Sequence, residues 1–384
     1  MNVIPKTSRS AVGAVATVAL SAVLLPVSTA AAAGNTAAQS RTVDSVTAQS
    51  FARIADAILT ERTSALLDTQ PAQQMLLLDK HIRISKGMAR TEDTGVSSLR
   101  SRKKRLADLG EAYTASDTKV AVDEAQVKNG RATVEVTETT TLTYKKVRGD
   151  EPSTTGFKAR HELTFAAGRG GSWELTGITP KDEGPRAINA PVAKVAAPAP
   201  TTTTPKATPA STTRPSRPAP SKPTTSTSGY DYAAMASYAE KYWRNYNPAY
   251  RSFNSAGGDC TNFISQALKA GGWKDEAGSS SDYGKWWYAS SNQSDSWVGA
   301  NEWSWYALNS KRVTNLSNVY QLGVGDILQM DFDRDGSKDH SMITTYRSRA
   351  GVPYLTYHST NTYRKSVASI IASNPDAVYY AYRT

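Results

Sequence analysis

One stretch rich in Pro, Thr, Ser and Ala, residues 189–229, limits what this chain can fold into. Such a composition cannot bury enough apolar surface to offset the entropy lost on ordering, so we expect a disordered or extended linker. Its basic residues, for example Lys206 and Lys222, give it positive charge without a single acidic residue. The 384-residue chain is therefore predicted to form two domains, over 41–188 and 230–384.

The N-terminus has the features of a targeting segment. Two basic residues precede an apolar run from Ala11 to Val27, and small residues follow at 31–33. This order is typical of a secretory signal peptide, here over 1–33. A membrane anchor is the alternative, but the run is short for a span and contains Pro26. We therefore expect a secreted, extracellular protein that can associate with the cell wall.

The first domain is predicted to be α+β. Apolar residues recur at helical spacing over 44–67, after the good N-cap Asp44, and a second helix is predicted over 98–113. Beyond residue 117 the pattern alternates in short strands, with a hairpin turn at Asn129-Gly130. Helices followed by an antiparallel meander indicate an α+β fold, and the order of elements resembles the cystatin-like α+β rolls. No catalytic constellation stands out, so the role of this domain is unknown.

The formal net charge of +11 is unevenly distributed. Residues 230–384 carry 15 Lys or Arg and 14 Asp or Glu, so the basic excess lies in the rest of the chain. On an exported protein, positive segments are attracted to anionic cell-surface polymers. We expect no nucleic-acid partner, since no binding motif accompanies the dispersed charge. No later stretch is long and apolar enough for an integral membrane segment in the mature chain.

The sole cysteine, Cys260, stands at the start of a predicted helix in the second domain. Asp259 is a good N-cap type, and Gly271-Gly272 provides a stop. The apolar face of this helix comprises Phe263, Ile264, Ala267 and Leu268. In the first turn, unpaired backbone N–H groups and the helix dipole favour a thiolate. A buried core residue is the alternative, but an unpaired cysteine in an exported protein indicates reactivity.

Two histidines follow on predicted strands. His340 begins the strand 339–346, and His358 ends the strand 354–358. A cysteine nucleophile needs a histidine that accepts its proton and later protonates the leaving amine, and this histidine needs a third group to fix its tautomer. We predict Cys260 as nucleophile and His340 as base. For the third group we prefer His358, with Asn361 as the alternative.

A cluster of aspartates precedes His340. Asp331, Asp333 and Asp335 alternate before Gly336, as in a calcium loop, but Met342 stands where that loop has a bidentate Glu. We favour a polar hairpin turn, with a structural calcium at the Asp331-Asp335 loop as the alternative. No H-E-x-x-H or comparable spacing indicates a zinc hydrolase. We therefore predict no catalytic metal and no cofactor.

These motifs resemble the bacterial putative amidase domain, a family similar to the papain-like cysteine peptidases and amidohydrolases. The resemblance covers most of 230–384 and rests on DCTNFISQ at 259–266, GDI at 325–327, DHS at 339–341 and His358. It implies a papain-like fold and amide hydrolysis through a thioester, with Cys260 as nucleophile and His340 as base. Papain-like enzymes often place a glutamine oxyanion donor shortly before the cysteine, and none stands there. Asn254 is one substitute, and the backbone N–H of Cys260 is the firmer candidate.

The leading hypothesis is a secreted cysteine amidohydrolase that cleaves amide bonds in cell-wall peptide or another extracellular peptide. A secreted thiol peptidase acting on proteins is the nearest alternative. A catalytically idle wall-binding module is the alternative from another class. Substitution of Cys260 by Ala would abolish turnover in an enzyme and change nothing in an idle module.

Overall fold

The fold combines helices with a large antiparallel sheet and is therefore α+β, as predicted. The computed structural model describes residues 41–69, 83–168, 172–182, 184–191, 207–220, 222 and 229–384. The predicted signal peptide, 1–33, lies outside the described residues. Among the described helices, none combines the length and apolar character needed to cross a bilayer.

Two long helices open the described chain after the short strand β1 (Arg41–Thr42). Helix α1 (Ser45–Ser64) begins where predicted, because the Asp44 carboxylate accepts hydrogen bonds from the backbone N–H groups of Val46 and Thr47. Helix α3 (Lys86–Asp108) begins earlier than the predicted start at 98, since the Ser85 hydroxyl caps its first turn. Met88, in that added turn, is buried in the core.

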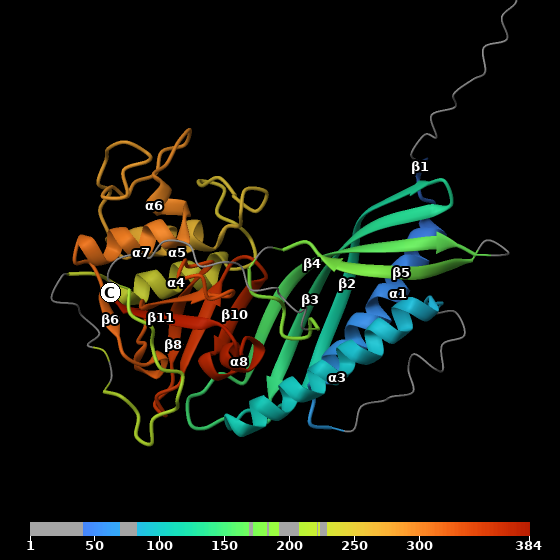
Figure 1. Cartoon of the computed structure of the whole chain (residues 1–384), viewed down its shortest axis with the longest axis horizontal. Coiled ribbons are helices and arrows are strands. Elements are labelled where there is room, and N and C mark those ends of the chain that lie inside the picture. Colours follow the sequence, from blue (N-terminus) through green and yellow to red (C-terminus); the bar gives the residue numbers. More distant parts are fainter. Residues whose placement is uncertain are drawn as a thin grey trace, which may run out of the picture. The chain divides into compact units, whose positions relative to one another are not determined.

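Four long strands form an antiparallel meander after α3: β2 (Tyr113–Lys128), β3 (Arg131–Tyr144), β4 (Thr154–Ala167) and β5 (Trp173–Pro180). The hairpin between β2 and β3 turns at Asn129 and Gly130, both of which have positive φ, as predicted from the sequence. Helices α1 and α3 lie along one side of these strands (Figure 1). Phe51 of α1 packs on Phe165 of β4, with ring centroids 4.3 Å apart.

The C-terminal region alternates helices with short strands. Its helices are α4 (Tyr232–Tyr242), α5 (Cys260–Ala270), α6 (Asp295–Val298), α7 (Ala300–Asn309) and α8 (Val367–Ser373), and η2 (Val319–Gln321) is a 3-10 turn. Its strands are β6 (Thr314–Leu316), β7 (Ile327–Asp331), β8 (His340–Arg347), β9 (Pro353–Tyr357), β10 (Asn361–Ser366) and β11 (Val378–Arg383). They pair antiparallel in the order β10-β9-β8-β7-β11-β6.

The two faces of this sheet carry different cores. Phe263 and Ile264 of α5 pack with Ile343 of β8 on one face. Met342 of β8 packs with Ile370 of α8 on the other. Side chains alternate along a strand, so neighbouring residues of β8 enter opposite cores.

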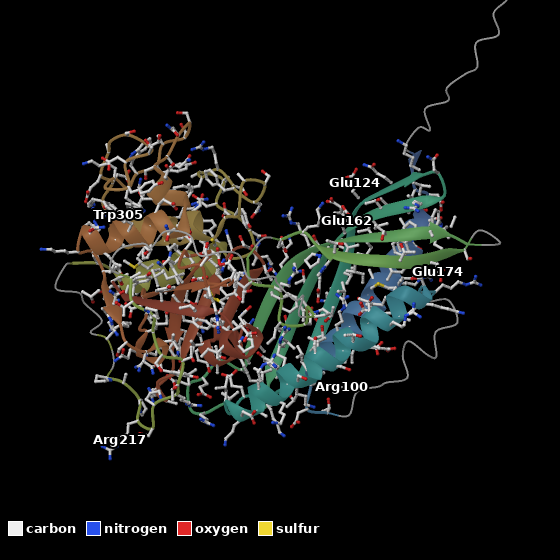
Figure 2. All side chains as sticks on the ribbon, viewed as in Figure 1. Arg100, Glu124, Glu162, Glu174, Arg217 and Trp305 are labelled. Carbon is white, nitrogen blue, oxygen red and sulfur yellow. The ribbon has the colours of Figure 1, made fainter. Side chains whose placement is uncertain are left out.

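Most indoles of the C-terminal region fill the core rather than a surface. Trp273, Trp286, Trp297 and Trp303 are all almost fully buried. They pack in contact, for example Trp286 and Trp297 with ring centroids 4.6 Å apart. Trp305 on α7 is only partly buried and is labelled in Figure 2. Aromatic burial of this kind stabilises the helical side of the sheet.

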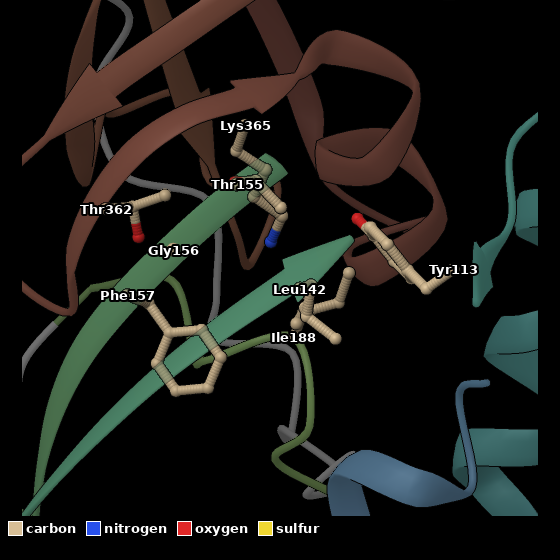
Figure 3. A pocket seen from close by; sticks show the side chains of 8 residues that line it. All are labelled: Tyr113, Leu142, Thr155, Gly156, Phe157, Ile188, Thr362 and Lys365. Carbon is tan, nitrogen blue, oxygen red and sulfur yellow. The ribbon is translucent and has the colours of Figure 1, made fainter. Parts of the chain in front are cut away.

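Strand β4 also pairs with β10, which joins the sheets of the two predicted domains into one within the described residues. Thr362 is the register partner of Phe157. A small pocket at this junction is lined by Tyr113, Leu142, Thr155, Gly156, Phe157, Ile188, Thr362 and Lys365 (Figure 3). The Lys365 amine enters it, and burial lowers the pKa of this amine to about 7. Residues 41–182 and 230–384 are thus directly connected by backbone hydrogen bonds.

Part of the stretch predicted to be a disordered linker is ordered. Residues 207–220 lie along the C-terminal strands, where the backbone N–H of Ala210 donates to Tyr379 O (2.8 Å) and that of Ser211 donates to Ser317 O (2.9 Å). Their composition buries little apolar surface, but backbone pairing satisfies their polar groups. Arg217 in this segment extends outward (Figure 2). The rest of 192–228, except residue 222, lies outside the described residues.

Candidate functional site

Helix α5 places Cys260 in its first turn, as predicted. Gly257 and Gly258 both have positive φ, which lets the chain turn sharply into the helix. The face of α5 that carries Phe263 and Ile264 is fully buried against β8. The thiol is therefore fixed by the packing of the whole helix.

The Cys260 thiol is buried, with 5% of the residue exposed. Its sulfur lies 3.7 Å from the Thr261 hydroxyl, which in turn lies 2.9 Å from the Ser341 hydroxyl on β8. Burial raises the pKa of the thiol, while the Thr261 hydroxyl and the Ser341 backbone N–H act in the opposite direction. We expected the helix start to favour the thiolate, but here the cost of desolvation is larger.

His340 is the first residue of β8, at the beginning of the strand as predicted. It is fully buried, and neither ring nitrogen has a hydrogen-bond partner among the described residues. Burial lowers the pKa of the ring to about 3, so the imidazole is neutral at ordinary pH. Unpaired polar atoms in a buried ring cost free energy, and a functional role is one explanation for them.

The His340 ring and the Cys260 thiol are not hydrogen-bonded to each other. Ser341, the next residue, faces α5 through Thr261, so alternation directs His340 to the other face of the sheet. There its ring makes an edge contact with Tyr357, with centroids 5.2 Å apart at 82°. An ion pair between thiolate and imidazolium is therefore not assembled in this arrangement.

His358 contacts Asp259 rather than His340. Its Nδ1 lies 2.6 Å from Asp259 Oδ2, and its Nε2 lies 2.9 Å from the carbonyl of Tyr242. The ring is stacked between Tyr246 and Phe263, each with centroids 3.9 Å away. The partners of the two ring nitrogens are thus a carboxylate and a backbone carbonyl, which are both hydrogen-bond acceptors. His358 thus supports the residue that precedes the cysteine.

Asp259 is the site residue that the sequence did not reveal. It was read as a helix cap, but its side chain makes no cap bond and is almost fully buried. Its Oδ1 accepts from the Phe253 backbone N–H (2.8 Å) and from the Asn262 amide (2.9 Å). Together with His358, these bonds hold the loop before α5. An aspartate directly before the only cysteine was the available signal.

The two asparagines considered from the sequence both approach Tyr246. Asn361 Oδ1 accepts from the Tyr246 hydroxyl at 3.0 Å, and the Asn254 amide lies 3.1 Å from it. Neither has a hydrogen bond to His340, whose ring nitrogens are unpaired. Both asparagines therefore hold Tyr246, whose ring stacks on that of His358.

Asp331, Asp333 and Asp335 gather as the calcium-loop pattern suggested. Their carboxylate oxygens lie within 4.8 Å of one another. The Asp331 carboxylate accepts from the backbone N–H groups of Arg334 and Gly336 (2.6 and 3.0 Å). Burial raises the pKa of Asp331. A polar turn explains these bonds, and calcium binding stays a prediction.

Comparison with known proteins bears on the C-terminal region. Residues 229–382 match the family model described as "Putative amidase domain", which supports an amidase-like domain at the C-terminus. The curated relatives it matches are two proteins of Bacillus subtilis (strain 168). One, "Uncharacterized protein YhbB", is 36% identical over 140 residues, which cover 35% of this chain and 44% of that protein. The other, "Uncharacterized protein YjcM", is 34% identical over 147 residues, covering 36% and 32%.

The matched region thus spans less than half the length of either relative. Among solved structures, the intermembrane space region of chloroplast protein ARC6 aligns with 36% of this chain and 98% of that chain. The TM-score is 0.24 and the sequence identity 16%. A likeness this low supports no argument about fold or function.

Proposed function

We propose that this protein is a secreted, papain-like cysteine amidohydrolase that cleaves amide bonds in cell-wall peptide. The observation that carries the proposal is the position of Cys260 in the first turn of α5, beside the backbone N–H of Ser341, the residue that follows His340. This region matches the putative amidase family. The N-terminal sequence supports export, and the basic excess outside 230–384 supports association with an anionic wall.

In the proposed reaction, the Cys260 thiol transfers its proton to the neutral His340 imidazole and attacks the substrate carbonyl. The tetrahedral intermediate collapses to a thioester as the imidazolium returns the proton to the leaving amine. Water, deprotonated by His340, then attacks the thioester carbonyl, the C–S bond breaks, and the imidazolium returns the proton to the Cys260 sulfur as the acid leaves. The backbone N–H of Cys260, at the start of α5, is the proposed oxyanion donor.

The remaining residues have positioning roles in this proposal. Asp259 and His358 hold the loop that leads into α5, so the thiol keeps its place during the reaction. His340 must turn at the end of β8 to bring a ring nitrogen to the sulfur. Catalytic hydrogen bonds are often long or misaligned before substrate binds.

The test is digestion of purified peptidoglycan by the full chain, with released amines and fragments followed by mass spectrometry. Reducing agent keeps the Cys260 thiol from oxidising, and calcium is added in case the aspartate loop binds it. Cys260→Ala and His340→Gln should release nothing, while Asp123→Ala, at an exposed carboxylate on β2, should match the parent. Equal release by Cys260→Ala would rule out the cysteine mechanism.

Casein in parallel separates the alternatives. Cleavage of casein without release from peptidoglycan would identify a peptidase that acts on proteins. Binding to cell walls that survives in Cys260→Ala, with no turnover by the parent, would identify a binding module.

A further inference from the structure

His340 is covered by a segment from another part of the chain. Gly184, beyond the end of β5, lies directly against the imidazole: a Cβ built on it would be 3.0 Å from His340 Nδ1 and 3.2 Å from Ser359 Cβ. Its φ of +101° is one that side chains other than glycine rarely adopt. The absence of a side chain is therefore what allows this backbone to approach the ring so closely.

Both flanks of this contact are fixed. Upstream, the Asp182 carboxylate accepts from the backbone N–H of Arg160 (2.7 Å) and from its Nε (3.0 Å). Downstream, the buried Arg102 guanidinium donates to the carbonyls of Ile188 and Ala190. Segment 184–190 is thus anchored by hydrogen bonds on both sides of Gly184.

Asn189, between Ile188 and Ala190, provides a further anchor on the downstream side. The Asn189 amide donates to Glu138 Oε1 (2.7 Å) and to the Thr63 hydroxyl (2.8 Å), and all three side chains are buried. Hydrogen bonds to buried charged groups are among the stronger ones. The downstream flank is therefore anchored to the N-terminal core by buried side chains.

We propose that segment 184–190 is an intramolecular inhibitor of the amidase site, which must be displaced before His340 can turn toward Cys260 and meet substrate. The inference rests on the proposed function, because inhibition has meaning only if His340 is a base. The ring under Gly184 is fully buried and Cys260 nearly so, so a substrate carbonyl reaches neither in the covered state. Displacement exposes a neutral imidazole with two vacant nitrogens.

In this proposal, the substrate competes with the segment for the covered surface. The upstream anchor is the weaker one, since Arg160 is 44% exposed and its ion pair with Asp182 is screened by solvent. The segment would therefore detach first at Asp182 and remain attached on the Arg102 side.

The test measures access to His340 directly. Diethyl pyrocarbonate modifies neutral imidazole, and peptide mapping by mass spectrometry reports each histidine separately. Two full-length variants loosen the segment: Asp182→Ala removes the upstream anchor, and an insertion of six Gly and Ser residues between Gly184 and Pro185 slackens it without touching either anchor. Asp123→Ala is the control for loss of an exposed carboxylate.

In the parent, His340 should be modified far more slowly than a histidine in an unstructured peptide. The slackened chain should raise this rate by about tenfold or more, as expected when local opening becomes easier, and Asp182→Ala should raise it less. Amine release from peptidoglycan should rise in the same order. His161, buried and bonded to Glu138, should not change and reports that the fold is intact.

The outcomes separate the two proposals. If the slackened chain and the parent show equal modification of His340, the segment does not cover the site and the inference is wrong. If modification rises and the parent releases amine, but the slackened chain releases no more than the parent, the segment is not an inhibitor. If modification rises while no variant releases any amine, the covering is real and the proposed wall-amidase function fails instead.

Discussion

The buried pair of Asp259 and His358 gives a quantitative prediction about the loop before α5. Their side chains are 1% and 2% exposed and meet at 2.6 Å. Removing one partner from such a buried pair typically costs about 3–5 kcal/mol. We expect His358→Phe, which keeps the aromatic stack with Tyr246 and Phe263, to lower the free energy of unfolding by about 3–5 kcal/mol.

A double-mutant cycle isolates the pair itself. Asp259→Asn removes the charge but keeps an oxygen for the Phe253 N–H, and the double variant buries no unpaired charge. The double variant should therefore be more stable than the sum of the two single effects by about 2 kcal/mol. Urea unfolding followed by tryptophan fluorescence measures each corner of the cycle.

A matched pair of exposed residues provides the control. Lys104 and Asp108 on α3 are 82% and 66% exposed and 3.9 Å apart, so the same cycle there should give a coupling close to zero. A coupling at Asp259 and His358 as small as that of the exposed pair would refute the argument that this contact holds the site.

Three further predictions concern the same chain. Because burial raises the pKa of Cys260, its alkylation by iodoacetamide should accelerate steadily with pH through neutrality, and a plateau at acidic pH would contradict the unassembled thiol–imidazole arrangement. The unfolded chain protonates His340 near the ordinary pKa of 6.5 and the folded chain only near 3, so stability should fall as pH drops through this interval, by roughly 3–5 kcal/mol in total, and the fall should be smaller in His340→Gln in urea titrations at each pH. Glu92→Ala leaves the Arg62 guanidinium buried and unpaired, so thermal unfolding should show a loss of about 3–5 kcal/mol, whereas a loss below 1 kcal/mol would mean that water replaces the carboxylate.

Local patterns predicted much of the site. Helical spacing after Asp259 was enough to place Cys260 in the first turn of α5, and the strand predicted over 339–346 placed His340 at the start of β8. The Asn129-Gly130 turn was likewise encoded in two residues that tolerate positive φ. These features depend on a few neighbours along the chain, which a sequence displays directly.

Contacts between distant segments could not be predicted in this way. A strand pattern gives the face on which His358 lies but not that a carboxylate from the start of α5 would reach it. The start of a helix favours a thiolate, yet the pKa of the Cys260 thiol depends on the solvent that the complete fold excludes. The contact of Gly184 with His340 joins residues from different regions, and glycine in a connecting segment carries no local sign of such a role.

The position of Lys222 bears on where this domain begins. The family match starts at residue 229, but Lys222 is buried seven residues earlier, with its ammonium 2.5 Å from Asp326 Oδ1. Asp326 is fully buried and has one other cationic neighbour, Arg383, among the ion pairs of the described residues. A fragment cut at the similarity boundary would keep the acid and lose half of its neutralising charge. The residues that neutralise Asp326 thus extend beyond the region that matches the family model.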